Sequence, residues 1–367
     1  MDKLFALITL IYSTFLMLVR HGALALGQRT AAKPEPSAFQ PISVIIPARN
    51  EQTKLLLLLE SLARLDYPSE SYELILINDH SQDGSAQFLA TQTICPKLRV
   101  IDFYDELPGL IGKKAALQKG IEAAKYDLLA FSDADCILPS TWLQEINRAA
   151  DPETDYLLSY SVMRRTPSGS TLRLKNFERS VYYALAAAGL YFRIPITSSA
   201  CNMVYRKELF YKSRGFSGIG HLASGADDLL LMKMMPNIRK AAYNPSPSMQ
   251  VCSVDGSSAS QHFHTNIRRA SKFKHHPWWV KALSAFIFLY FCLFYANLPR
   301  LCSGKAGTLL KASLLIKTSA EITLVISHLK LIKRPYLGVL YPLQILIFPL
   351  QFIFYALRGS LGSYRWK

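Results

Sequence analysis

The sequence has few cysteines and none of the paired spacings that bind zinc. Six cysteines occur among 367 residues, at positions 95, 136, 201, 252, 292 and 302. None forms a Cys-x-x-Cys pair, and two lie in or beside apolar, membrane-like sequence. This pattern excludes a structural zinc site and a disulfide framework, and it indicates free thiols in a reducing compartment. The chain also has no internal repeat.

Acidic residues are scarce relative to basic ones. Asp and Glu number 26 against 42 Lys and Arg, so the formal net charge is +16 at pH 7. Such a charge favours anionic partners, which include nucleic acid, anionic lipid headgroups and phosphorylated substrates. The chain lacks zinc-finger spacing and any DNA- or RNA-recognition motif, and its apolar segments favour lipid. We therefore expect a membrane partner and no nucleic acid.

Apolar residues make up 50% of the chain and concentrate at its two ends. Residues 4–19 form an unbroken, mostly apolar run, somewhat shorter than the roughly 20 residues that a spanning helix needs. A cleaved signal peptide ending near Ala23–Leu26 is one interpretation. A transmembrane anchor over residues 1–27 is the interpretation that the later membrane segments favour. More basic residues follow the run than precede it, so the positive-inside rule places the next segment in the cytoplasm.

Membrane-like sequence returns over residues 276–367, where we expect two or three transmembrane helices. Residues 282–298 and 336–357 are candidates for spanning helices. Residues 308–329 are ambiguous, because they carry charged side chains, of which Lys317 and Glu321 are spaced to pair on one helix face. If this segment spans, the C-terminal tail lies outside; if it lies in the interface, the tail lies inside. We expect a multi-pass protein of the cell membrane.

Between the membrane regions, residues 28–41 form a Pro-rich linker, and strands then alternate with helices. The expected strands cover residues 42–47, 73–78, 98–101 and 127–132, and the expected helices cover 54–65 and 113–125. This alternation predicts the α/β class, with a mainly parallel central sheet and helices on both faces. Such sheets bind ligands beyond the carboxyl ends of their strands. We therefore expect three polar segments to converge on one crevice: Pro47–Glu51, Asn78–Asp83 and Asp133–Asp135.

The alternation weakens after about residue 150. Residues 172–192 predict a long amphipathic helix, with Phe177 on its apolar side and Arg173, Lys175 and Arg179 on its polar side. Such a helix either packs on the domain or lies on the bilayer surface. Packing is the commoner outcome.

Two carboxylates, Asp133 and Asp135, stand one residue apart where a buried apolar run ends. Two like charges there are costly unless a cation binds between them. Residues i and i+2 of a strand point the same way, so both side chains can aim at one point if the extended geometry persists. Hard oxygen ligands suit Mg²⁺ or Mn²⁺, which commonly bridge to substrate phosphates. Two solvated loop aspartates are the alternative.

The remaining polar clusters each allow a functional and a structural interpretation. Pro47–Glu51 and Asn78–Ser85 contain ordinary turn formers and caps, although Asp79 stands at a strand end where a ligand would lie. Lys113 begins a helix and suits either a phosphate or a solvated helix face, without the spacing of a P-loop. Asp227 and Asp228 open an apolar helical run, where aspartates stabilise the helix dipole or act as a general base.

Taken in order, five motifs resemble glycosyltransferase family 2, of the GT-A fold, over about residues 40–275. They are Ile42–Glu51, Asn78–Ser85, Gly112–Gln118, Phe131–Asp135 and Gly225–Lys233. The resemblance implies an inverting, hexosyltransferase-type transfer from a nucleotide-diphospho-sugar, for which we expect a UDP-sugar. It assigns donor binding to Pro47, Glu51, Asp79, Lys113 and Asp133. It assigns the divalent metal, Mg²⁺ or Mn²⁺, to Asp133 and Asp135.

The resemblance also implies a general base. In this family the base is the aspartate of an acidic pair that stands six residues before a basic residue. Asp227 has that spacing to Lys233, with Ala226 where the first acid usually stands, so Asp227 is the expected base and Asp228 the alternative. Ser198–Phe210 resembles the acceptor-side strand of the family. The base would act on the acceptor while the metal neutralises the leaving diphosphate.

One departure from the family concerns polymer synthesis. Processive synthases carry Gln-x-x-Arg-Trp after the base, whereas here Thr265 replaces Gln, Arg268 is retained and Arg269 replaces Trp. This favours a single transfer to a lipid or lipid-linked acceptor, by a catalytic domain over residues 42–275 that faces the cytoplasm. Arg268 and Arg269, with Lys272 and Lys274, suit anionic headgroups, the donor diphosphate or simple juxtamembrane charge. A processive polysaccharide synthase and a non-catalytic membrane scaffold are the alternatives.

Overall fold

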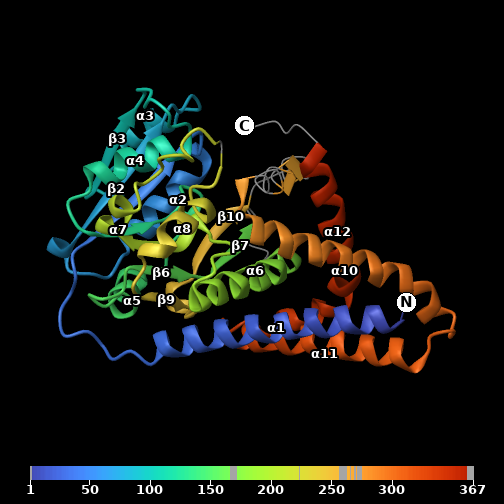
Figure 1. The fold of residues 1–367 in the computed structure, drawn as a ribbon. Coiled ribbons are helices and arrows are strands. Elements are labelled where there is room, and N and C mark those ends of the chain that lie inside the picture. The colour runs from blue at the N-terminus through green and yellow to red at the C-terminus, as the bar shows by residue number, and fades with distance from the viewer. Residues whose placement is uncertain are drawn as a thin grey trace. The chain divides into compact units, whose positions relative to one another are not determined.

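The protein is described by a computed structural model that covers most of the chain (Figure 1). It describes residues 2–165, 172–222, 224–255, 263–264, 266–267, 270 and 275–361. The chain forms two compact units. The helical unit comprises Met1–His21, Ser257–Lys330 and Arg334–Lys367, and the sheet unit comprises Gly22–Gly256 and Leu331–Lys333. All six cysteines are free thiols, as predicted.

The sheet unit is built on a seven-stranded sheet in the order β3-β2-β1-β4-β8-β6-β9. Its strands are β1 (Ile42–Ala48), β2 (Tyr72–Asp79), β3 (Leu98–Phe103), β4 (Leu128–Phe131), β6 (Tyr156–Ser159), β8 (Met203–Arg206) and β9 (Ala241–Asn244). Strands β3, β2, β1 and β4 run parallel, and so do β6 and β9. Strand β8 is antiparallel to both of its neighbours, β4 and β6. The predicted α/β class with a mainly parallel sheet is confirmed.

A smaller sheet of three strands joins segments from distant parts of the sheet unit. It has the order β5-β10-β7 and consists of β5 (Cys136–Ile137), β10 (Val251–Asp255) and β7 (Ser161–Arg165). Strand β10 is antiparallel to β5 and parallel to β7. It therefore ties the segment after Asp135 to the segment after β6.

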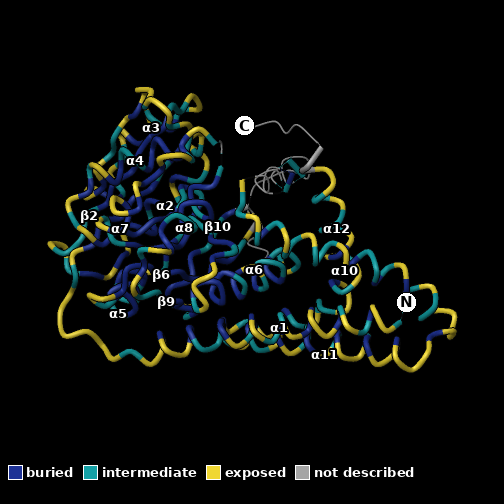
Figure 2. The backbone as a smooth tube through the Cα atoms, viewed as in Figure 1, coloured by how far each residue is buried: buried dark blue, intermediate teal, exposed yellow. Residues whose placement is uncertain are grey.

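Helices cover the large sheet because its central strands are apolar throughout. Ile42, Val44, Ile45 and Ile46 of β1 are all fully buried, which is typical of a parallel strand with both faces covered. Strands β4 and β6 are buried throughout, and Figure 2 shows the interior of this unit largely in the buried class. The helices are α2 (Gln52–Ala63), α3 (Ser85–Thr91), α4 (Lys113–Ala123), α5 (Trp142–Ala149), α6 (Arg173–Phe192), α7 (Lys207–Lys212) and α8 (Asp228–Met234). Short 3₁₀ helices are η1 (Ser69–Ser71), η2 (Ala200–Asn202), η3 (Met235–Asn237) and η4 (Pro247–Met249).

Gly120 lets helix α4 approach the sheet closely. A Cβ atom at this position would lie 2.6 Å from side-chain carbons of both Ile45 and Ile77. Any larger residue would push the helix away from β1 and β2. The first residues of α4, which include Lys113, are thereby held near the carboxyl ends of these strands.

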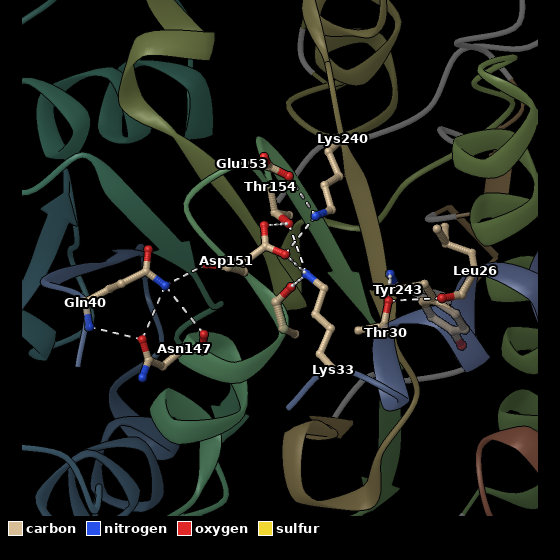
Figure 3. A network of polar contacts seen from close by, with 12 residues as sticks. Leu26, Thr30, Lys33, Gln40, Asn147, Asp151, Glu153, Thr154, Lys240 and Tyr243 are labelled. Atoms are coloured by element: carbon tan, nitrogen blue, oxygen red, sulfur yellow. Dashed lines mark hydrogen bonds and ion pairs between the residues drawn. The ribbon is translucent and has the colours of Figure 1, made fainter. Parts of the chain in front are cut away.

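The segment before β1 is held to the sheet unit by polar contacts (Figure 3). The Thr30 hydroxyl donates to the Leu26 carbonyl at 3.0 Å and accepts from the Tyr243 amide at 3.2 Å. The Lys33 ammonium group lies 2.9 Å from the Asp151 carboxylate. The Gln40 amide nitrogen of the backbone donates to Asn147 Oδ1 at 3.0 Å. Helix α1 ends at Ala31, so residues 28–31 of the expected linker are helical.

The helical unit contains long apolar helices. They are the first part of α1 (Asp2–Ala31), α10 (Trp278–Cys302), α11 (Thr308–Leu331) and α12 (Tyr341–Leu361), with η6 (Pro335–Leu340) before the last. Among the described residues, three segments are long and apolar enough to cross a membrane: Asp2–Ala31, Trp278–Cys302 and Pro335–Arg358. The chain is therefore a membrane protein by its composition. Helix α11, the segment that was ambiguous from sequence, is not among the three.

Helix α11 carries a buried ion pair. Lys317 Nζ lies 2.7 Å from Glu321 Oε1, which confirms the predicted pairing, and the lysine side chain is 1% exposed. The hydroxyls of Tyr12 and Tyr341 donate to the Glu321 carboxylate at 2.9 and 2.8 Å. The Lys317–Glu321 pair thus has its hydrogen-bond partners within the helical unit.

Candidate active site

The loops after β1 and β2 are joined by hydrogen bonds. The backbone N–H of Asn50 donates to Ser81 Oγ at 3.0 Å, and the backbone N–H of Gln82 donates to the side-chain Oδ1 of Asn50 at 2.8 Å. The backbone N–H of Gln52 donates to Asp83 Oδ2 at 3.1 Å. Asn50 adopts a positive φ of 55°, which asparagine tolerates better than most residues. The expected convergence of these two loops is confirmed.

Pro47 and Asp79 occupy neighbouring strand ends within this region. Pro47 is half-buried near the end of β1 and pairs in register with Ile77 of β2. Asp79 ends β2 and is 5% exposed, with its carboxylate 2.7 Å from His80 Nδ1. The other ring nitrogen of His80 lies 3.0 Å from the Tyr104 carbonyl oxygen. Sequence reasoning missed His80, although its place beside a strand-end aspartate was a signal.

Asp133 forms an ion pair with Lys113. Lys113 Nζ donates to Asp133 Oδ1. The Lys113 side chain is 34% exposed and the Asp133 side chain is 32% exposed. Burial lowers the pKa of Lys113, but the negative charges of Asp133 and Asp227 outweigh burial and raise it above its ordinary value. The site therefore brings together residues from three distant segments around one fixed positive charge.

The extended geometry that would let Asp133 and Asp135 aim at one point does not persist beyond β4. Strand β4 ends at Phe131, and the Cys136 amide donates to the Asp133 carbonyl at 3.1 Å, which closes a turn. The two carboxylates are nevertheless near enough to interact. Burial, followed by the charge of Asp133, raises the pKa of Asp135 to about 6. Glu51 adds to this effect and Lys54 opposes it, which places the end of the β1 loop within electrostatic range.

Glu51 and Asp135 therefore differ in their partners. Glu51 Oε2 accepts from Lys54 Nζ at 2.6 Å. Asp135 Oδ1 accepts from the Cys136 thiol at 3.4 Å, and no lysine or arginine pairs with it in the described part of the chain. An uncompensated carboxylate beside Asp133 fits a divalent cation, which would relieve the repulsion between the two. Within those same described ranges no group of three or more His, Cys, Asp and Glu side chains is arranged so that it could hold a metal ion by itself.

Asp227 and Asp228 lie at the start of α8, with different exposure. Asp227 caps the helix, and its Oδ1 accepts from the Asp228 amide at 2.9 Å. Asp228 is 5% exposed and accepts from the Leu229 amide at 2.8 Å. Asp227 is half-buried and acts on the pKa of Lys113. Of the two, Asp227 is the more exposed carboxylate and the one whose charge acts on Lys113.

Two lysines, Lys114 and Lys233, hold the loop before Asp227. Lys114 is 2% exposed, and its ammonium group donates to the carbonyls of Leu222 and, at 2.8 Å, Ser224. Lys233 donates to the carbonyls of Gly215 at 2.5 Å and Ser217 at 2.6 Å. Both lysines pair with backbone oxygens, which no spacing rule identifies. The loop that leads to Asp227 is thus fixed from two sides.

Residues 43–213 match the model of the family described as Glycosyl transferase family 2. This part of the chain belongs to glycosyltransferase family 2. The fold is GT-A, as the motif order implied: a mannosyltransferase from Pyrobaculum calidifontis, PcManGT, solved with GDP-Man and Mn²⁺, superposes with a TM-score of 0.51. That match covers 94% of this chain and 99% of the other at 20% identity, and it supports the fold alone.

Curated relatives match over shorter stretches. An undecaprenyl-phosphate 4-deoxy-4-formamido-L-arabinose transferase of Aeromonas hydrophila is 33% identical over 133 residues, which are 36% of this chain and 39% of the relative. Glycosyltransferase AglE of Haloferax volcanii is 32% identical over 108 residues, or 28% of this chain and 33% of the relative. The chain therefore spans less than half the length of these relatives.

The basic residues Arg268, Arg269, Lys272 and Lys274, and also Thr265, lie outside the described residues.

Proposed function

We propose that this protein is an inverting, hexosyltransferase-type glycosyltransferase that moves a sugar from a nucleotide-diphospho-sugar to a lipid or lipid-linked acceptor. The observation that carries the proposal is the position of Lys113, whose charge interacts with both Asp133 and Asp227. Asp133 belongs to the expected donor-diphosphate site and Asp227 is the expected base. A single-transfer enzyme needs these two groups on either side of one sugar.

The donor would lie along the carboxyl ends of the parallel strands. Pro47 lies near the end of β1, Glu51 follows that strand and Asp79 ends β2, where the nucleoside of a UDP-sugar would bind. Lys113 begins α4, and a helix start with a lysine is suited to a phosphate oxygen. The family of residues 43–213 supports this orientation of the donor.

Asp133 and Asp135 would hold the divalent metal, Mg²⁺ or Mn²⁺. When bound, the ion would neutralise the developing charge on the leaving diphosphate. Asp135, whose pKa is raised to about 6 by burial and Asp133, would bind such an ion in its ionised form. Phosphate oxygens and water would complete the coordination, since Mg²⁺ commonly takes few protein ligands.

Asp227 would take the proton from the acceptor as the bond to the sugar forms. Its half-buried carboxylate and its interaction with Lys113 favour it over the buried Asp228. The relative from Aeromonas hydrophila, which is named for an undecaprenyl-phosphate acceptor, supports a lipid acceptor. Three candidate spans support a multi-pass protein of the cell membrane, with the sheet unit in the cytoplasm.

The first test is nucleotide binding by the detergent-purified protein, with UDP, GDP and CDP, each with and without Mn²⁺. We expect metal-dependent binding of UDP that Asp135→Ala abolishes. Absence of binding to any of the three by folded protein would favour the non-catalytic scaffold. Product length separates single transfer from a processive synthase, because a ladder of products would contradict single transfer.

A further inference from the structure

The guanidinium of Arg179 on α6 lies beside the Cys201 thiol, whose pKa is lowered by a hydrogen bond with Cys136 and by the charge of Arg179. Its Nε donates to the Ser161 carbonyl at 3.1 Å, and its Nη2 donates to Ser161 Oγ and lies 3.7 Å from Cys201 Sγ. The Tyr183 ring centroid lies 5.9 Å from the guanidinium carbon. Among the described residues no carboxylate pairs with Arg179, and its Nη1 has no hydrogen-bond partner. The sequence predicted this residue on the polar side of the helix.

The guanidinium lies two side chains away from the proposed metal site. Cys201 hydrogen-bonds with Cys136, and the Cys136 thiol donates to Asp135 at 3.4 Å. Arg179 is half-buried, so it keeps accessible surface although the protein surrounds it. The contacts with Ser161 and Cys201 leave the N–H donors of Nη1 without an acceptor, and an unpaired donor inside the protein is costly until a bound anion accepts from it.

The order of the strands says which part of a bound substrate would reach Arg179. Along the sheet, β2 and β1 precede β4, and β8 and β6 follow it. Met203 of the antiparallel β8 pairs with Phe131 of β4, so Cys201 lies at the same sheet edge as the Asp133–Asp135 turn. Leu158 of β6 also pairs with Met203, which brings Ser161 to that edge.

A donor bound with its nucleoside at β2 and β1 and its diphosphate beyond β4 would place the sugar and then the acceptor toward β8 and β6. Arg179 contacts exactly the two segments at that far side, Ser161 and Cys201. The donor diphosphate already has Lys113 and the metal-binding carboxylates beside it. The group at Arg179 therefore belongs to the acceptor.

We propose that Arg179 binds a phosphoryl group carried by the lipid acceptor. A guanidinium presents several N–H donors in a rigid plane that matches phosphate oxygens, and Nη1 offers two such donors here. This inference rests on the proposed function and specifies its acceptor as a lipid phosphate or a phosphate-linked lipid. The donor diphosphate is the other possible source of the phosphoryl group.

Arg179→Gln and Arg179→Lys test the proposal in the full-length, detergent-purified protein. The probes are farnesyl monophosphate and farnesol, which differ only in the phosphate, and UDP with Mn²⁺ for the donor site. We expect Arg179→Gln to weaken farnesyl monophosphate binding by about tenfold or more, the loss of a charged hydrogen bond, and Arg179→Lys to lose less. Farnesol and UDP should bind as they do to the wild type.

Arg193→Gln is the matched control, because Arg193 follows the end of the same helix and its side chain donates to the Met235 carbonyl at 3.4 Å. Thermal unfolding of each variant shows whether the fold is intact, and Arg179→Lys keeps the charge if Arg179→Gln unfolds. Equal loss for farnesyl monophosphate and farnesol would overturn the proposal, as would wild-type protein that does not prefer the phosphate. Loss of UDP binding in Arg179→Gln would assign the residue to the donor instead. Wild-type protein that binds no nucleotide at all would be a failure of the proposed function and not of this inference.

Discussion

The ammonium group of Lys114 donates a hydrogen bond to the Ser224 carbonyl at 2.8 Å, three residues before Asp227. Its neighbour Lys113 pairs with Asp133. Two consecutive lysines at the start of α4 therefore join the expected diphosphate side of the site to the loop that carries the expected base. The position of Asp227 relative to Asp133 depends on this short segment.

Lys114→Met should lower turnover far more than it lowers nucleotide affinity. The substitution keeps the volume of the side chain but leaves the carbonyls of Leu222 and Ser224 without this donor, so the Asp227 loop shifts. A displacement of about 1 Å near the reacting atoms can cost about 100-fold in rate. Steady-state turnover and UDP binding measure the two effects separately. Lys119→Met on the same helix is the control, and equal losses in turnover and in UDP affinity for Lys114→Met would contradict a positioning role.

Asp227→Asn should abolish most transfer and leave the nucleotide site intact. A general base contributes about 10²- to 10⁴-fold to the rate, and the amide keeps the shape of the carboxylate. Asp228→Asn should act mainly on stability, because Asp228 is 5% exposed and accepts from the Leu229 amide. Product formation from a radiolabelled donor, together with thermal unfolding, distinguishes the two variants. Full activity of Asp227→Asn with loss of activity in a stable Asp228→Asn would make Asp228 the base.

Asp151→Asn should remove a pH-dependent part of the stability of the sheet unit. Burial raises the pKa of Asp151, but hydrogen bonds from Lys240 and Lys33 outweigh burial and hold it well below its usual range. A carboxylate with a depressed pKa in the folded state contributes its full stabilisation above its unfolded-state pKa of about 3.9. That stabilisation is lost as the pH falls toward the pKa of the folded state. Wild-type protein should therefore lose more stability than Asp151→Asn between about pH 4 and pH 2. Thermal midpoints at several pH values measure this, with the exposed Asp105→Asn as control; parallel curves for wild type and Asp151→Asn would refute it.

Glu321→Gln should destabilise the helical unit. It leaves the 1%-exposed Lys317 without its carboxylate partner, and breaking a buried ion pair in this way costs about 3–5 kcal/mol. The double variant Lys317→Met with Glu321→Gln removes both charges and should recover much of the loss. Unfolding in detergent gives the comparison, with the exposed Lys311→Met as reference. If Glu321→Gln is as stable as wild type, the ion pair does not hold α11 in place.

The strands and most of the helices could be predicted because their signals are local. Ile42–Ala48 and Tyr72–Asp79 are dense in apolar β-branched and aliphatic residues, and a parallel sheet puts their carboxyl ends at one edge. That topological rule is why Glu51 and Asp79 could be assigned to the same region before any coordinates. The ordered motifs then gave the GT-A fold.

Long side chains and turns limited the prediction of the site. Helical spacing assigned Arg179 to a polar face, but the guanidinium reaches across to Ser161 and Cys201, which lie far away in the sequence. The Asp133–Asp135 pair leaves strand geometry because β4 ends at Phe131 and a turn follows, and the spacing of the two aspartates does not distinguish a turn from an extended segment. Lys114 binds backbone carbonyls of a distant loop. Every residue type has such a carbonyl, so the sequence pattern could not predict this contact.

The polar contacts of residues 30–40 have a practical consequence for isolating the sheet unit. A truncated chain that starts at Ile42 would lose the Lys33 partner of Asp151 and the Gln40 partner of Asn147. It would also uncover the Tyr243 amide, which donates to Thr30. Proteolytic trimming should therefore stop upstream of Thr30, and a fragment that keeps Gly22 onward retains every one of these contacts.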